Sequence, residues 1–199
     1  MERSVRIRGF TEDDVELLAG LARDQRVVRY VGDGRPWSDA RIAERARQAL
    51  NPGDWGEVGR DRWGIVWCDG LTGPAAAGSP GDEVGVEPQT ERIGLCVAKF
   101  AAGDDAIEIG YWLDPDYWGR RLARPMVAAV VDWVDSGLRR AGRPPADLVA
   151  RIQPANLPSA AAVRGLGFDC VAREAVPRPG GAGADDVDVY VRRAARIRV

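Results

Sequence analysis

The stretch AIEIGYWLDPDYWGRRLARPMVAAVVDWV, residues 106–134, decides the fold of this chain. Residues 106–113 alternate between two faces with the period of two that a pleated strand requires. Asp114-Pro115-Asp116 ends this strand, and from Leu122 onward the apolar residues recur as in an amphipathic helix. A strand, a basic loop and a helix in this order direct backbone N–H groups and the positive end of a helix at one place, which predicts a phosphate site.

Length and composition predict one soluble domain over residues 1–199. Hydrophobic residues make up 45% and charged residues 29% of the chain, and the net charge of −2 gives no general attraction to nucleic acid. No apolar run is long enough to cross a membrane, and the charged N-terminus does not resemble a signal peptide. Cys68, Cys96 and Cys170 lie in apolar, strand-like segments, which predicts buried thiols and a cytoplasmic location.

Histidine is absent from the sequence. This excludes catalysis by a Ser-His-Asp or Cys-His group and any histidine metal site, so we expect no metal. Proton transfer in this chain must therefore use a carboxylate, a tyrosine, a cysteine or water.

The remaining segments predict an α+β fold. Alternating or apolar runs indicate further strands, and helices are expected after the capping residues Thr11, Ser38 and Asn156. The order β-α-α-β-β-β-α-β-α-β-β predicts a mixed sheet with helices on both faces. Irregular composition marks a loop insertion at 69–91, either a lid or a surface insertion, and a basic tail at 194–199. The further strands are expected at residues 4–8, 62–68, 92–100, 148–153, 168–174 and 186–193, the last two joined by a hairpin at 177–185.

Three segments resemble the GNAT N-acetyltransferase superfamily: EIGYWLDPDYWGRRLA at 108–123, NLPSAAAVRGLGF at 156–168 and RYVGDGRPWS at 29–38. They are most similar to the branch that contains the ribosomal-protein N-terminal alanine and serine acetyltransferases. The resemblance implies a mostly antiparallel sheet of six to seven strands, in which the fourth and fifth strands splay apart around the pantetheine arm of an acyl-CoA.

The resemblance also implies which residues bind this co-substrate. Main-chain atoms of the fourth strand would line the pantetheine and thioester, the loop after it would hold the pyrophosphate, and two residues near the second motif would face the arm, one of them close to the sulfur. The strand residues are Tyr111, Trp112 and Leu113. The loop residues are Trp118, Gly119, Arg120, Arg121, Leu122 and Ala123, with Arg124 beside them. The two residues that would face the arm are Asn156 and Ser159, and Ser159 is the one close to the sulfur.

Arg121 departs from the family pattern, which has a glycine at this position of the loop. A glycine lets the backbone approach a phosphate closely, and a side chain there could crowd it. Alternatively, Arg121 supplies positive charge to a phosphate together with Arg120 and Arg124.

Acyl transfer to an amine requires removal of a proton from the amine and stabilisation of the leaving thiolate. Glu108 is the candidate base, directly or through water; its alternatives are a structural ion pair with an arginine and an exposed edge position. Ser159 is the candidate donor to the sulfur, or else a helix-capping residue, and Tyr111 is an alternative acid or a core residue. Acceptor selection is expected from Tyr30, Trp37 and Trp63 together with Glu108, the 69–91 loop and the 177–185 hairpin. Core packing also explains tryptophans.

These expectations describe a cytoplasmic N-acetyltransferase that uses acetyl-CoA or another acyl-CoA and transfers the acyl group by direct attack in a ternary complex. The acceptor is a small-molecule amine or a protein N-terminus, and the acidic balance favours the small molecule. Neither nucleic acid nor a membrane is expected as a partner, and the oligomeric state stays open, with a homodimer among the expectations. Two alternatives remain: an enzyme whose acyl donor is bound to a carrier protein, and a silent GNAT-like domain that binds a ligand or partner.

Overall fold

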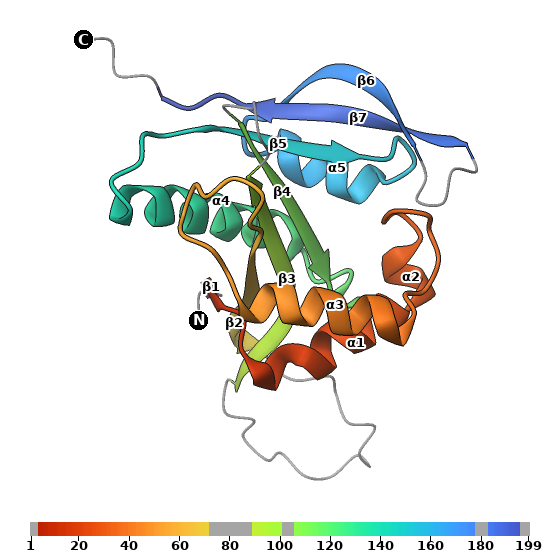
Figure 1. Ribbon diagram of the computed structural model, residues 1–199. Helices are drawn as coiled ribbons and strands as arrows, with labels where there is room; N and C mark the ends of the chain where they lie inside the picture. Colours follow the sequence, from red (N-terminus) through yellow and green to blue (C-terminus); the bar gives the residue numbers. More distant parts are fainter. Residues whose placement is uncertain (1–3, 72–88, 101–105, 178–182, 196–199) are drawn as a thin grey trace, which may run out of the picture.

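The structure is a computed structural model that describes residues 4–71, 89–100, 106–177 and 183–195. Its seven strands form one sheet in the order β1-β2-β3-β4-β5-β7-β6 (Figure 1). Neighbouring strands are antiparallel except β4 and β5, which are parallel. This confirms the predicted mixed, mostly antiparallel sheet. The strands are β1 Ser4–Gly9, β2 Arg62–Leu71, β3 Gln89–Phe100, β4 Ala106–Leu113, β5 Asp147–Ile152, β6 Asp169–Pro177 and β7 Ala184–Arg192.

Helices cover both faces of the sheet, as predicted (Figure 1). One face packs against α4 and α5, and the other packs against α1, α2 and α3, so each face has its own apolar core. The helices are α1 Val15–Arg23, α2 Gln25–Val28, α3 Asp39–Leu50, α4 Ala123–Arg140 and α5 Leu157–Arg164, with short 3-10 turns at Glu12–Asp14 (η1) and Pro115–Tyr117 (η2).

The alternation of β4 divides its side chains between the two cores. Ile107 and Ile109 are buried against the apolar stripe of α4, where Met126 and Val130 are fully buried. Trp112 belongs to the opposite face and packs on the core formed with α1–α3. The central strand therefore presents every second residue to a different layer, as the sequence pattern indicates.

A buried carboxylate joins the first strand to the first helix. Asp14 is 0% exposed and accepts hydrogen bonds from Arg8 Nη1 at 2.6 Å and Nη2 at 2.9 Å. It also accepts from the backbone N–H of Thr11 at 2.9 Å, as the predicted helix cap requires, and from Arg92 at 3.4 Å. These contacts compensate the desolvation of the carboxylate, and they connect β1, β3 and the start of α1.

Some local expectations need correction. Residues 25–28 form the short helix α2, which was not predicted; the Asp24 carboxylate caps it by accepting from the N–H of Arg26 at 2.8 Å. The predicted 69–91 loop is shorter, because β2 continues to Leu71 and β3 begins at Gln89. Residues 72–88, the hairpin tip at 178–182 and residues 196–199 of the tail lie outside the described residues.

The cysteines also differ from expectation in one case. All three are described and none forms a disulfide, but only Cys68 and Cys96 are buried, whereas Cys170 is exposed. Cys170 lies on β6, which is the edge strand of the sheet and whose residues are all exposed. An apolar neighbourhood in sequence does not bury a residue when no layer covers its strand. Within the described ranges, no helix has the length and apolar character needed to span a membrane.

Candidate active site

The two parallel strands separate soon after they begin to pair. β4 and β5 are in register at only three positions, from Ala106 opposite Asp147 to Glu108 opposite Val149. On its other edge β4 stays paired with β3 as far as Leu113. The β5-facing edge of β4 beyond Glu108 is therefore an extended backbone without a neighbouring strand, and such an edge can accept an extended ligand as an added strand.

Glu108 lies at the last paired position and faces the α1–α3 side. One carboxylate oxygen accepts from Lys99 Nζ at 2.6 Å and the other from Arg151 Nη1 at 2.6 Å. Burial raises the pKa of Glu108, but the positive charges and hydrogen bonds of Lys99 and Arg151 outweigh it and hold the pKa below its usual value. Glu174 on β6 extends this set of ion pairs through Arg151 at 3.2 Å. These contacts match the ion-pair alternative for Glu108, and they keep the carboxylate charged.

Two hydroxyl groups meet on the opposite side of the sheet. Tyr111 Oη lies 2.6 Å from Ser159 Oγ and 3.3 Å from the backbone carbonyl oxygen of Ser159. The side chain of Asn156 caps α5 and accepts from the Ser159 N–H at 3.4 Å, as predicted from the sequence. The structure thus brings Tyr111, Ser159 and Asn156 together from β4 and the start of α5, beside the region where β4 and β5 have separated.

The loop before α4 has the conformation that the family glycine would allow. Arg121 has φ +60°, the one positive φ among non-glycine residues of the described chain, and Gly119 has φ +74°. Among the described residues, no side chain caps the N-terminus of α4, and the first backbone N–H groups of a helix have no partner within the helix. The loop is held in place by Leu122, which is 2% exposed. Arg121 thus adopts the left-handed backbone conformation that glycine adopts more readily.

The other loop residues have distinct positions. The Trp118 indole N–H donates to the Leu113 carbonyl at 2.9 Å and covers the end of β4. The Arg120 guanidinium lies 5.3 Å from the centre of the Tyr117 ring. Arg121 and Arg124 are exposed. Three arginines, at positions 120, 121 and 124, thus lie in the chain next to the start of α4, which no side chain among the described residues caps.

The tryptophans expected at the acceptor side form a packed cluster. Trp37 and Trp63 are only 7% and 6% exposed, and both meet Trp112 edge-on at 5.0 Å and 6.5 Å between ring centres. Trp37 and Trp63 are therefore core residues, which is the alternative to acceptor binding that the sequence left open. Tyr30 is half-buried, and its hydroxyl donates to the Ala155 carbonyl at 3.3 Å, which joins the segment after α2 to the loop before α5.

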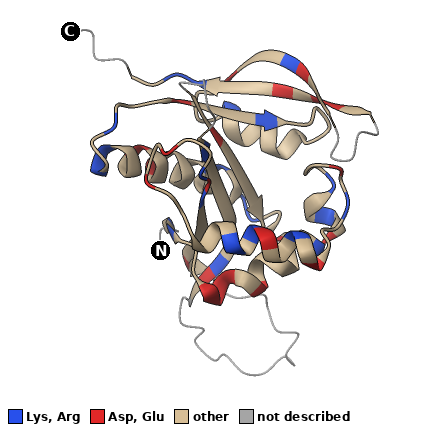
Figure 2. Cartoon of the chain, in the orientation of Figure 1, with Lys and Arg blue, Asp and Glu red and all other residues tan. Residues whose placement is uncertain are grey.

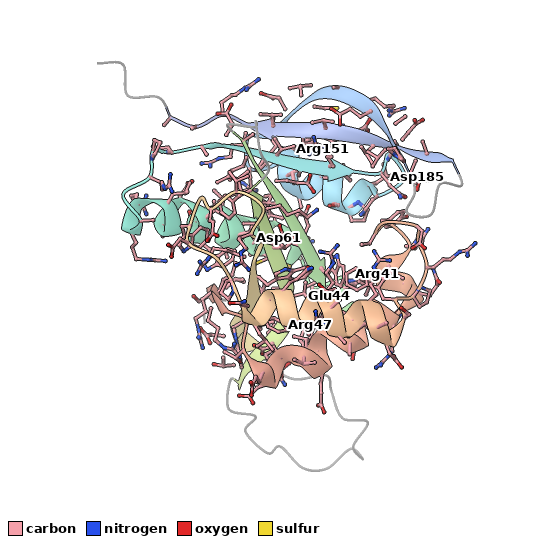
Figure 3. The ribbon with its side chains drawn as sticks, viewed as in Figure 1. Arg41, Glu44, Arg47, Asp61, Arg151 and Asp185 are labelled. Carbon is pink, nitrogen blue, oxygen red and sulfur yellow. The ribbon has the colours of Figure 1, made fainter. Side chains whose placement is uncertain are left out.

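The structure adds residues that the sequence did not single out. Lys99 is opposite Glu108 in the β3–β4 register, and Arg151 comes from β5. Asp61, next to β2, is half-buried; burial raises its pKa, although Lys99 and Arg45 act against this. Asp61 and Arg151 are both labelled in Figure 3. Asp61, Lys99, Glu108 and Arg151 alternate in charge across neighbouring strands. Predicting such a row requires the strand register, which a single sequence does not show. Figure 2 shows both signs of charge along α1 and α3.

The fold and this site define an acyltransferase-like domain, in which two parallel strands separate beside the start of a helix. A model of the Acetyltransferase (GNAT) domain matches residues 4–169, so the chain belongs to the GNAT acetyltransferase family and is a GNAT-type N-acetyltransferase. Comparison with curated protein sequences finds no match.

Solved structures agree with this fold. Spermidine N-acetyltransferase from Vibrio cholerae, in complex with CoA and spermine, aligns with a TM-score of 0.67 and 13% identity over 96% of this chain and 95% of that one. A ribosomal L7/L12 alpha-N-protein acetyltransferase in complex with CoA gives 0.65 and 16% over 96% and 94%. An aminoglycoside acetyltransferase in complex with ribostamycin and CoA gives 0.62 and 16% over 96% and 93%.

Proposed function

We propose that this protein transfers an acetyl group from acetyl-CoA to a primary amine of a small molecule, by direct attack in a ternary complex. One observation carries the proposal. β4 and β5 separate after Glu108, with a carboxylate on one face of the sheet and the Tyr111–Ser159 hydroxyl pair on the other. A thioester held in this opening would have a proton acceptor on the amine side and a hydrogen-bond donor on the sulfur side.

The residues present fit CoA. The open edge of β4 offers the main chain of Tyr111, Trp112 and Leu113 to an extended pantetheine arm, with Asn156 and Ser159 beside it. The loop 118–123 and the uncapped start of α4 offer backbone N–H groups to a pyrophosphate. Arg120, Arg121 and Arg124 add positive charge that does not depend on pH. The CoA complexes among the similar folds support this assignment.

In the proposed reaction, backbone N–H groups of β4 polarise the thioester carbonyl, and Ser159 donates a hydrogen bond to the sulfur. Glu108 receives the proton of the amine, directly or through water. Because both of its oxygens already bind cations, this role requires Lys99 or Arg151 to share the carboxylate with the acceptor. If Glu108 serves only as an ion pair, the amine loses its proton to water.

The acceptor divides the proposal into two cases. A small amine is favoured because the net charge of −2 offers no general attraction to a ribosome. The alternative is the N-terminus of a protein, in keeping with the sequence resemblance to the ribosomal-protein branch. Mass-resolved screening with acetyl-CoA, an amine library and peptides that begin with alanine or serine separates the two. We place the reaction in the cytoplasm, in a monomer or a homodimer.

Calorimetry tests the donor. Binding of CoA and acetyl-CoA at micromolar concentration is expected, and acetylation of at least one amine should follow. A protein that does not bind CoA at millimolar concentration would contradict this proposal and favour a carrier-bound donor or a silent domain. The positive φ of Arg121 supports the CoA-binding case, because it is the left-handed conformation that a glycine at this position would also allow.

A further inference from the structure

The hydrogen bond between Tyr111 and Ser159 joins β4 to α5, at the part of β4 that does not pair with β5. Tyr111 comes from the free part of β4, and Ser159 comes from the first turn of α5. Both side chains are half-buried, so neither hydroxyl is dispersed in bulk solvent. The 2.6 Å distance from Oη to Oγ is short even for a hydrogen bond between hydroxyl groups.

The direction of this hydrogen bond decides what Ser159 can do. Tyr111 could donate to Ser159 Oγ at 2.6 Å or to the Ser159 carbonyl oxygen at 3.3 Å. The shorter contact is favoured, because a phenol is a stronger acid than an aliphatic alcohol and is the better donor of the pair. When the phenol donates to Oγ, the hydrogen of Ser159 cannot point back at Tyr111 and is left for another acceptor.

We propose that Tyr111 is a positioning residue that orients the hydroxyl of Ser159, so that the Ser159 hydrogen points to the sulfur of a bound CoA. This inference rests on the proposed function and deepens it. The phenol also polarises the serine O–H bond, since a hydroxyl that accepts a hydrogen bond becomes a better donor. The phenol of Tyr111 therefore acts through Ser159 and need not touch the co-substrate.

Tyr111 keeps its own proton in this arrangement. Burial raises the pKa of Tyr111 to about 12. The phenol therefore keeps its proton over the pH range in which a thiol with a pKa of about 8.5 ionises. In the transfer, the amine nitrogen bonds to the carbonyl carbon and the C–S bond breaks with its electron pair on sulfur. The surplus proton of the amine goes to Glu108 or water, and Ser159 stabilises the thiolate by a hydrogen bond without losing its proton.

The ionisation of the bound CoA thiol measures this effect without any turnover. The ultraviolet absorbance of the thiolate, followed against pH, gives the pKa of the thiol, which is about 8.5 for an unperturbed cysteine-like thiol. We expect the wild-type protein to lower this pKa. Ser159→Ala should raise it again by about one unit, the size of one lost hydrogen bond to a charged group. Tyr111→Phe should raise the thiol pKa by nearly as much, although Ser159 is still present.

The double variant decides between positioning and independent roles. If Tyr111 acts through Ser159, Tyr111→Phe/Ser159→Ala should match Ser159→Ala alone, whereas independent effects should add. In acetyl transfer, Tyr111→Phe should lower kcat about tenfold with little change in the KM for acetyl-CoA. Tyr117→Phe is the matched control. It removes a phenol that donates to Glu91 on β3, and it should leave the thiol pKa unchanged. Thermal melting checks that each variant is folded.

The outcomes separate the inference from the proposed function. If wild type binds CoA but Tyr111→Phe has the wild-type thiol pKa, or if the two substitutions add, the positioning role is wrong and acetyl transfer can still hold. If the thiol pKa responds as expected but no amine is acetylated, the proposed function is wrong and the positioning role holds. A protein that does not bind CoA overturns both.

Discussion

Glu108 and Arg151 connect β4 and β5 at the point where the two strands part. The Arg151 Nη1 to carboxylate distance is 2.6 Å, and Glu108 is the last residue of β4 in register with β5. Lys99 holds the other carboxylate oxygen at 2.6 Å from β3. One carboxylate thus joins three neighbouring strands at the point beyond which β4 and β5 no longer pair.

The first prediction concerns the stability that this ion pair provides. The pKa of Glu108 is lowered in the folded protein, so its contribution is present above the unfolded pKa of about 4.3 and is lost as pH falls through the folded value. Glu108→Gln should lower the free energy of unfolding by about 1–2 kcal/mol at pH 7. The loss should shrink as pH falls below the unfolded pKa of Glu108 and vanish once pH is below the folded pKa. Urea unfolding against pH measures it. The more exposed Glu174→Gln is the control, with an expected change of under about 1 kcal/mol.

The second prediction concerns the same residue in catalysis. If Glu108 accepts the proton of the amine, Glu108→Gln should lower kcat mainly at low pH, where the amine is protonated and needs a base. At high pH the free amine attacks without this help, and the variant should approach wild type. The pH–rate profile of kcat decides the matter. A variant profile of unchanged shape would leave Glu108 with the structural role alone.

The third prediction concerns the strained loop residue. A non-glycine residue at φ +60° is disfavoured by about 1 kcal/mol, and glycine adopts this conformation freely. Arg121→Gly should therefore raise the free energy of unfolding by about 0.5–1 kcal/mol. Arg120→Gly, one residue away and without a positive φ, should be neutral or destabilising. Chemical denaturation compares the two. Calorimetry on Arg121→Gly then shows whether the guanidinium adds to CoA affinity.

The fourth prediction concerns the contact between Trp37 and Trp112, which joins the segment before α3 to β4. Their rings meet edge-on at 5.0 Å, and Trp37 is buried. Trp37→Ala should lower the free energy of unfolding by about 3–5 kcal/mol. A double-mutant cycle with Trp112→Ala should give a coupling of about 0.5–1.5 kcal/mol. Strict additivity would show that the two rings pack independently.

The fifth prediction concerns Asp14. Burial raises the pKa of this carboxyl, but hydrogen bonds from Arg8 and Thr11 lower the pKa by more than burial raises it. The net pKa is therefore below the usual value. Asp14→Ala should destabilise the protein by about 1.5–3 kcal/mol at neutral pH, because Arg8 and the N–H of Thr11 lose the carboxylate that accepts their hydrogen bonds. The contribution of Asp14 is present above about pH 4 and falls as pH drops through the folded pKa. The neighbouring, exposed Asp13→Ala is the control, and thermal melting against pH is the measurement.

Much of the fold follows from local pattern. The period of two in residues 106–113 and the apolar stripe after Leu122 specify the central strand and helix, because each pattern buries apolar side chains in only one kind of element. Asn156 caps α5 as its position predicts. The helix α2 was missed because a single turn has no measurable periodicity, and Cys170 was misplaced because its exposure depends on the strand order.

The candidate site divides in the same way. The sequence by itself determined the strand, loop and helix that can hold a phosphate, and it singled out Glu108, Tyr111 and Ser159 as residues able to move or share protons. Only the tertiary structure decided what those groups touch. Lys99 and Arg151 meet Glu108, and Tyr111 meets Ser159 48 residues away, because strand register and helix packing bring them together. A hydrogen bond depends on distances of tenths of an ångström between distant parts of the chain, and a local pattern carries no information on such distances.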